Sequence, residues 1–128
     1  MSFLDWAWYI PVFQGIVLGI AAMAIHECAH VTAARALGIR VKSIGLDWRG
    51  LYIVRESGPP RENIIIALSG PFINLLLSIS WHWLPTFALA NLCLAVCNLL
   101  PISCSDGLRA LSTWQEWKAG ESLDNVSS

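Results

Sequence analysis

Two long apolar segments dominate the chain and predict membrane-spanning helices. Residues 6–25 are 20 positions without a charged side chain, and residues 63–105 are 43 more. A helix needs about 20 apolar residues to cross a bilayer, so the second segment is long enough for two helices. Pro85 suits the start of a helix, and the tryptophans just before it suit a membrane interface, which puts the break at residues 81–85. We therefore expect three spans, at about residues 7–36, 62–80 and 86–101.

The segment between the first two spans predicts a β-hairpin. Residues 40–46 and 51–55 are rich in Val, Ile, Leu and Tyr, and the Asp-Trp-Arg-Gly run at 47–50 is turn material. We expect a hairpin at about residues 40–55. The sequence Gly58-Pro59-Pro60 is a strong breaker that separates it from the second span.

The end of the chain predicts an interfacial helix and then a polar tail. Over about residues 107–119, apolar side chains recur at helical spacing beside charged ones, namely Leu108, Leu111, Trp114 and Trp117. From Gly120 onward we expect a frayed tail. No internal repeat or second soluble domain is visible. The expectation is one membrane-embedded unit over residues 1–128, an all-α polytopic membrane protein with three transmembrane helices, a short hairpin and this interfacial helix.

Composition and charge agree with a membrane protein and suggest its orientation. The chain is 55% hydrophobic with a mean hydropathy of +0.56 and only 13% charged, against about 25% charged in soluble domains. All eight basic residues lie at or after Arg35. The positive-inside rule then puts the N-terminus and residues 81–85 outside, and the hairpin and the C-terminus in the cytoplasm, in a multi-pass protein of the cell membrane. Asp5 near the start disfavours a signal peptide, and a net charge of −1 gives no reason to expect nucleic acid.

The first span ends in a motif that predicts a metal site. His26-Glu27-Cys28-Ala29-His30 has the pattern H-E-x-x-H. On a helix, residues i and i+4 share a face, so both imidazoles can bind one metal while Glu27 acts on a water molecule there. A lone match can also be a polar helix face. Ionisable groups inside a bilayer are costly, however, and a divalent cation would compensate them, so we expect zinc.

Catalytic zinc normally takes three protein ligands, so a third must be found. His82 lies at the predicted outer turn, whereas His26 is 20 residues beyond Trp6, or about 30 Å along a helix. We interpret His82 as an interfacial residue. Asp106 follows the start of the third span by about 20 residues and so reaches a depth similar to that of His26. It is the candidate third ligand, with a helix N-cap as its alternative role.

The four cysteines allow two interpretations. Cys28, Cys93, Cys97 and Cys104 lie in or beside the predicted spans, where cysteine packs as a small apolar residue. Cys93 and Cys97 are one helical turn apart, and Cys104 is close to Asp106, so a cysteine-containing metal site is the alternative. A disulfide framework is not expected in this context.

Two further motifs follow in order. Gly70-Pro71-Phe72-Ile73-Asn74 has the pattern G-P-x-x-N, and Asn98-Leu99-Leu100-Pro101 leads to Asp106-Gly107 in the pattern N-x-x-P-x-P-x-L-D-G. Together with H-E-x-x-H, these motifs resemble those of the site-2 protease family of intramembrane zinc metalloproteases. The resemblance covers most of the chain. Gly70-Pro71 can also kink a helix or allow close helix contact, and Asn74 and Asn98 can also be interhelical hydrogen-bonding residues.

The resemblance implies a three-helix core in which His26, His30 and Asp106 bind zinc and Glu27 is the general base. It implies substrate-binding roles for Asn98 and, by the same motif match, Asn74, and strand pairing between the hairpin and an unwound substrate. Two positions depart from the pattern. Ser103 replaces a proline and Ser105 a leucine, and we expect these serines to loosen the segment that presents Asp106.

The functional expectation is an intramembrane zinc endopeptidase that cleaves a transmembrane segment of a substrate protein. Its partners would be that substrate and the lipid bilayer, and three spans leave lateral surface for a second copy of the chain. The alternative is a catalytically inactive pseudoprotease that binds metal or a client helix. A third interpretation, a membrane metal carrier, would use the cysteines.

Overall fold

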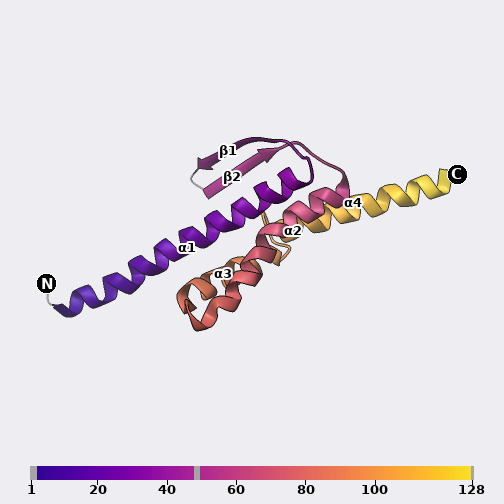
Figure 1. Cartoon of the computed structure of the whole chain (residues 1–128). Coiled ribbons are helices and arrows are strands. Elements are labelled where there is room, and N and C mark those ends of the chain that lie inside the picture. The colour runs from indigo at the N-terminus through magenta and orange to yellow at the C-terminus, as the bar shows by residue number, and fades with distance from the viewer. Residues whose placement is uncertain (1–2, 48–49, 128) are drawn as a thin grey trace.

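A computed structural model describes residues 3–47 and 50–127, and it is mostly helical with one two-stranded antiparallel sheet (Figure 1). Its elements are, in order, α1 (Phe3–Ala36), β1 (Val41–Asp47), β2 (Gly50–Arg55), α2 (Pro60–Leu77), the 3₁₀ helix η1 (Ser78–His82), α3 (Pro85–Leu99) and α4 (Asp106–Ser127). Prolines open both α2 and α3, where the missing N–H would have no helical partner in any case.

Two helical segments are long and apolar enough to cross a membrane. They are Tyr9–Ala36, with 28 residues and a mean hydropathy of 1.7, and Pro60–His82, with 23 residues and a mean hydropathy of 1.9. The third segment, α3, has 15 residues, or about 22 Å of helix, which is short of the roughly 30 Å hydrocarbon layer. Two of the three expected spans therefore coincide with helices that are long and apolar enough to cross a membrane, and the third does not. Helix α3 ends at Leu99 because Pro101 disfavours helical geometry in the residue before it.

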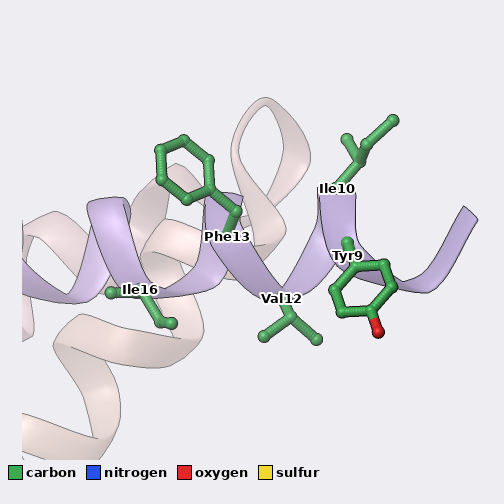
Figure 2. Close-up of a pocket in the computed structure, with 5 residues that line it drawn as sticks. All are labelled: Tyr9, Ile10, Val12, Phe13 and Ile16. Carbon is green, nitrogen blue, oxygen red and sulfur yellow. The ribbon is translucent and has the colours of Figure 1, made fainter. Parts of the chain in front are cut away.

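The N-terminal part of α1 carries a large apolar surface. Figure 2 shows Tyr9, Ile10, Val12, Phe13 and Ile16 spread around this part of the helix, where they line a shallow apolar pocket. Phe13 is 70% exposed and Ile20 65% exposed. Apolar patches of this extent are rare on soluble monomers and suit contact with lipid.

The C-terminal half of α1 packs against the rest of the chain along one face. In Figure 1, α2 runs back along this half, the β-hairpin covers another side of it, and α3 returns along α2. Helix α4 then packs against α2. The N-terminal end of α1 projects beyond the other helices. The H-E-x-x-H motif lies in this packed half, and both of its histidines are buried.

A tight helix end joins α1 to the hairpin. Gly38 has a φ of +74°; its N–H donates to the carbonyl of Arg35, and that of Ile39 to the carbonyl of Ala34. This is the Schellman arrangement, which glycine favours. It brings Ile39 into a small core with Ala34 and Ile66, so the hairpin is anchored to both α1 and α2.

The predicted hairpin at residues 40–55 is confirmed as the pair β1–β2. The register pairs Ile44 with Ile53 and Gly45 with Tyr52, and an irregularity lies between Val41 and Ser43. The turn expected at residues 47–50 includes Trp48 and Arg49, which lie outside the described residues.

The C-terminal expectation needs a correction. Helix α4 continues to Ser127, past the tail expected from Gly120, because one glycine costs a helix only about 1 kcal/mol and no proline follows it. Figure 1 shows the C-terminal part of α4 projecting beyond the other helices. The interfacial position expected for residues 107–119 stays a prediction.

Candidate metal centre

Three potential ligands from distant parts of the chain meet inside the bundle. Nε2 of His26 and Nε2 of His30 lie 3.0 and 3.1 Å from Oδ2 of Asp106, and 3.1 Å from each other. All three residues are buried, with exposed fractions of 4%, 9% and 5%. The structure thus brings together the three residues that the sequence predicted as ligands, 80 positions apart at the extreme.

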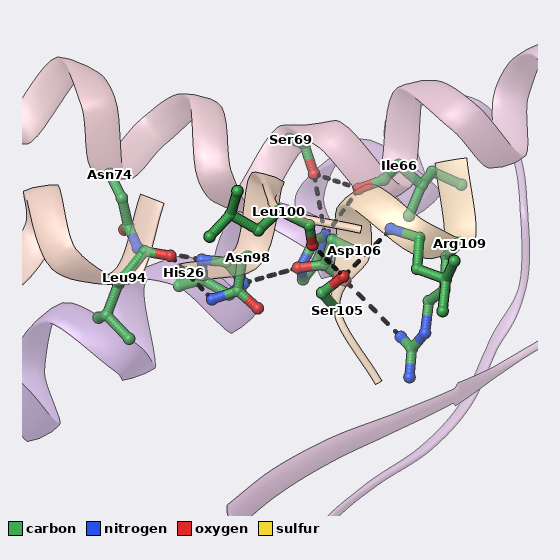
Figure 3. Close-up of polar contacts among 12 residues, drawn as sticks. His26, Ile66, Ser69, Asn74, Leu94, Asn98, Leu100, Ser105, Asp106 and Arg109 are labelled. Atoms are coloured by element: carbon green, nitrogen blue, oxygen red, sulfur yellow. Dashed lines mark hydrogen bonds and ion pairs between the residues drawn. The ribbon is translucent and has the colours of Figure 1, made fainter. Parts of the chain in front are cut away.

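Each ligand position has a local cause. One helical turn separates the two histidines on α1, which places their rings edge to face with centroids 4.7 Å apart. Asp106 is the first residue of α4. Helix α4 packs against α2, and Oδ2 of its first residue contacts both histidines; Figure 3 shows Asp106 in the same cluster as His26.

The triangle of ligand atoms fits a zinc ion. Ligands about 2.0–2.1 Å from zinc in a tetrahedron lie about 3.3 Å apart, and the three observed separations are 3.0–3.1 Å. Two imidazoles and one carboxylate are also a donor set that zinc prefers in catalytic sites. The residues present therefore fit zinc both in spacing and in chemistry.

The carboxylate of Asp106 is held in its charged form. Burial alone would raise the pKa of this carboxyl, but the close contacts with the imidazoles of His26 and His30 outweigh burial and keep the pKa below its ordinary value. Oδ1 lies 3.7 Å from Nη1 of Arg109, one helical turn further along α4. Oδ2 is therefore the oxygen directed at the histidines.

The second ring nitrogen of His30 has a partner that fixes its tautomer. Nδ1 of His30 donates to the carbonyl oxygen of Ile66 over 2.7 Å. A carbonyl can only accept, so the proton of the neutral ring is on Nδ1 and the lone pair is on Nε2. The hydroxyl of Ser69 donates to the same carbonyl and lies 3.3 Å from Nδ1. Such outer partners typically hold a metal-binding histidine in place.

Gly70 provides the space for the two rings. A Cβ atom at position 70 would lie 2.5 Å from Nε2 of His30 and 2.7 Å from Nε2 of His26, far closer than packed atoms approach. The close-contact interpretation of Gly70-Pro71 is thus correct, and the atoms in contact are those of the candidate ligands.

Asn74 and Asn98 occupy different environments. Asn74 is 0% exposed, and its Nδ2 lies 3.0 Å from Nδ1 of His26 (Figure 3). It therefore links α2 to α1, as the interhelical alternative expected, and has no surface that faces a substrate. Asn98 is partly buried and donates to the carbonyl of Leu94 on its own helix. Its substrate-binding role stays a prediction.

The connection from α3 to α4 is tightly held. Ser105 is buried, donates through Oγ to the carbonyl of Leu100 over 2.6 Å, and accepts from the N–H of Leu108 over 3.1 Å. This makes Ser105 the N-cap of α4. The expectation that Ser105 loosens the presentation of Asp106 is therefore wrong. A Cβ on Gly107 would meet the carbonyl oxygen of Leu99, so the two helix ends touch.

Of the other candidate residues, Glu27 lies beside the cluster, whereas the cysteines and His82 are not part of it. Glu27 is partly buried and interacts electrostatically with His30, His26 and Asp106, so it stands beside the cluster. All four cysteines are exposed. Within residues 3–47 and 50–127, the cluster of three potential ligands contains neither a cysteine nor His82, which removes the geometric support for a cysteine-containing site.

The sequence did not predict several residues that support the candidate metal centre. The carbonyl of Ile66 carries no side-chain signal, and Ser69 is an ordinary helix residue. Ser105 did carry a signal, because serine directly before a helix is a preferred N-cap. The sequence interpretation considered Ser105 only as a replacement of the leucine in the motif.

Comparison with known proteins gives relatives named as zinc metalloproteases. The chain is 29% identical over 126 residues to "Putative zinc metalloprotease sll0528" of Synechocystis sp., an alignment that covers 84% of the chain and 33% of the relative. It is 30% identical over 132 residues to "Putative zinc metalloprotease Rip3" of Mycobacterium tuberculosis, covering 85% and 33%. The chain thus spans about a third of the length of these relatives. No family model matches it.

Proposed function

We propose that the chain is a zinc metalloendopeptidase that cleaves transmembrane segments of substrate proteins within the membrane. The observation that carries the proposal is the triangle of His26, His30 and Asp106, with Glu27 beside it, on helices that include two candidate spans. The relatives named as zinc metalloproteases support the same chemistry, and the motif resemblance supports the intramembrane setting.

The chain's own residues have distinct tasks in this chemistry. His26, His30 and Asp106 would hold the zinc ion, which supplies Lewis acidity to polarise a carbonyl and make water nucleophilic at neutral pH. Glu27 accepts the proton of the attacking water and passes it to the nitrogen of the leaving amine as the carbon–nitrogen bond breaks. Asn98, partly buried near the end of α3, is the candidate for holding the substrate backbone.

The proposed setting has α3 as a short third span. Helix α3 returns to the level of the ligand cluster, because Asp106 follows its end by only seven residues and contacts His26. The N-terminus and the η1 end of the bundle then face outward, and the hairpin and α4 face the cytoplasm, in accord with the basic residues. The cluster would lie near the cytoplasmic edge, where water reaches it.

The test measures zinc and cleavage separately. We expect about one zinc per purified chain in detergent, and much less in Asp106→Ala. Glu27→Gln should keep the zinc and lose cleavage of a transmembrane substrate. If the wild type binds its client but gives no more cleavage product than Glu27→Gln, the protein is instead a pseudoprotease. Absence of zinc in the wild type after supplementation would overturn the proposal.

A further inference from the structure

The two histidines differ in how their second nitrogen is held. For His30 the partner is a backbone carbonyl, which only accepts. For His26 the partner is the side-chain amide of Asn74, whose Nδ2 lies 3.0 Å from Nδ1. An amide carries an acceptor at one end and two donors at the other. Asn74 can therefore match either tautomer of His26, which the Ile66 carbonyl cannot do for His30.

The orientation of the Asn74 amide is not fixed by its other contacts. Among the described residues, Oδ1 of Asn74 is buried without a hydrogen-bond partner, and the oxygen and the NH₂ group occupy nearly the same space. A half-turn of the amide exchanges them and again leaves one atom without a partner. The contact with Nδ1 of His26 therefore determines which of the two orientations the amide adopts.

Metal binding makes that choice. If Nε2 of His26 donates its lone pair to a metal, the proton of the neutral ring must be on Nδ1, and Nδ1 then needs an acceptor. The acceptor that Asn74 offers is Oδ1. With Nδ2 facing Nδ1, the lone pair is on Nδ1 and the proton is on Nε2, the nitrogen that faces Asp106. That tautomer cannot bind a metal through Nε2.

We propose that Asn74 is a positioning residue for the zinc site, whose Oδ1 accepts the Nδ1 proton of His26 and so keeps Nε2 available to the metal. The inference rests on the zinc site of the proposed function and deepens it. It replaces the substrate-binding role expected for Asn74, because a residue with no exposed surface cannot meet a substrate. Ile66 plays the equivalent part for His30, so α2 would orient both ligands of α1.

The chain provides a matched control in Asn91. This residue lies on α3, is also 0% exposed, and also has a buried Oδ1 without a partner among the described residues. Its Nδ2 donates to the carbonyl of Phe87 on its own helix. Replacement of Asn91 repeats the burial and size change at position 74 and leaves the histidine contact intact.

The experiment measures zinc affinity by competition with a chelating dye, for the wild type and for Asn74→Leu, Asn74→Asp and Asn91→Leu in detergent. Leucine removes the acceptor and should weaken zinc binding about 10- to 100-fold. Aspartate keeps an oxygen toward Nδ1, so affinity should stay within a few-fold of wild type or increase. Asn91→Leu should bind zinc like the wild type. Cobalt(II) in place of zinc should give a changed visible spectrum in Asn74→Leu only.

Two results would overturn the proposal. One is wild-type affinity in Asn74→Leu. The other is an Asn74→Asp variant that binds zinc much more weakly than the wild type, since that would make Asn74 a donor to His26. This comparison with the wild type also decides the question if the leucine variant does not fold. A wild-type protein that binds no zinc would refute the proposed function itself, which is a different outcome.

Discussion

Gly70 on α2 lies so close to His30 on α1 that a Cβ atom at position 70 would lie 2.5 Å from Nε2 of the histidine. The distance to Nε2 of His26 would be only 2.7 Å. The close packing of α2 against α1 is therefore also what leaves space for the two histidine rings of the candidate metal centre. A side chain at position 70 would compete with the metal ligands for the same space.

We expect Gly70→Ala to lower zinc affinity by about 10- to 100-fold, since the added methyl group displaces a ligand nitrogen. Chelator competition measures the affinity, and circular dichroism measures whether the helices are kept. Gly19→Ala is the matched control. Gly19 also lies in a helix but has nothing within 4 Å of its Cβ position, so alanine there should bind zinc normally and stabilise the helix slightly. Equal zinc binding by both variants would contradict the role assigned to Gly70.

The meeting of His26, His30 and Asp106 could be predicted from the sequence because it depends on spacing and helical rise along the chain. The i, i+4 spacing of His26 and His30 fixes their common face, and counting helical rise put Asp106 at a matching depth. The direction in which a side chain points around its helix is not given by depth. The sequence therefore left two roles open for Asn74, substrate binding and an interhelical hydrogen bond, and the structure places its side chain beside Nδ1 of His26.

The limits of the predicted helices have a similar explanation. Both α2 and α3 begin at a proline, which the sequence signals directly. The end of α4 was missed because a single Gly120 is too weak a breaker. The length of α3 alone does not decide whether it spans a membrane, because its 15 residues are fewer than a full span needs.

The contact between α3 and α4 makes a second prediction. A Cβ on Gly107 would meet the backbone carbonyl oxygen of Leu99 and lie 3.1 Å from that of Asn98. Backbone atoms cannot move aside as a flexible side chain can, so Gly107→Ala should destabilise the fold by about 1–3 kcal/mol and weaken zinc binding by displacing Asp106. Thermal unfolding and chelator competition measure the two effects. Gly120→Ala, in the same helix with nothing within 4 Å, should leave zinc binding unchanged and stabilise the helix slightly.

A third prediction concerns orientation in the membrane. A reporter enzyme inserted after Trp83, which is 80% exposed at the η1–α3 junction, should be active on the outer side. A reporter fused after Ser128 should report the cytoplasm. The reason is the distribution of basic residues, all of which lie at or after Arg35 and outside residues 62–108. Both reporters on one side would show that α3 does not return across the membrane.

The last prediction separates Ser105 from Ser103. Ser105 caps α4 and ties it to Leu100, so Ser105→Ala should cost about 0.5–2 kcal/mol of stability and, because Asp106 is the next residue, also weaken zinc binding. Ser105→Asn can restore a cap and should recover much of both losses. Ser103 is exposed, and its side chain lies 3.8 Å from Sγ of Cys104, so Ser103→Ala should change neither property. Zinc affinity measured beside thermal unfolding decides the matter: if Ser105→Ala binds zinc as tightly as wild type, the cap contributes to folding alone.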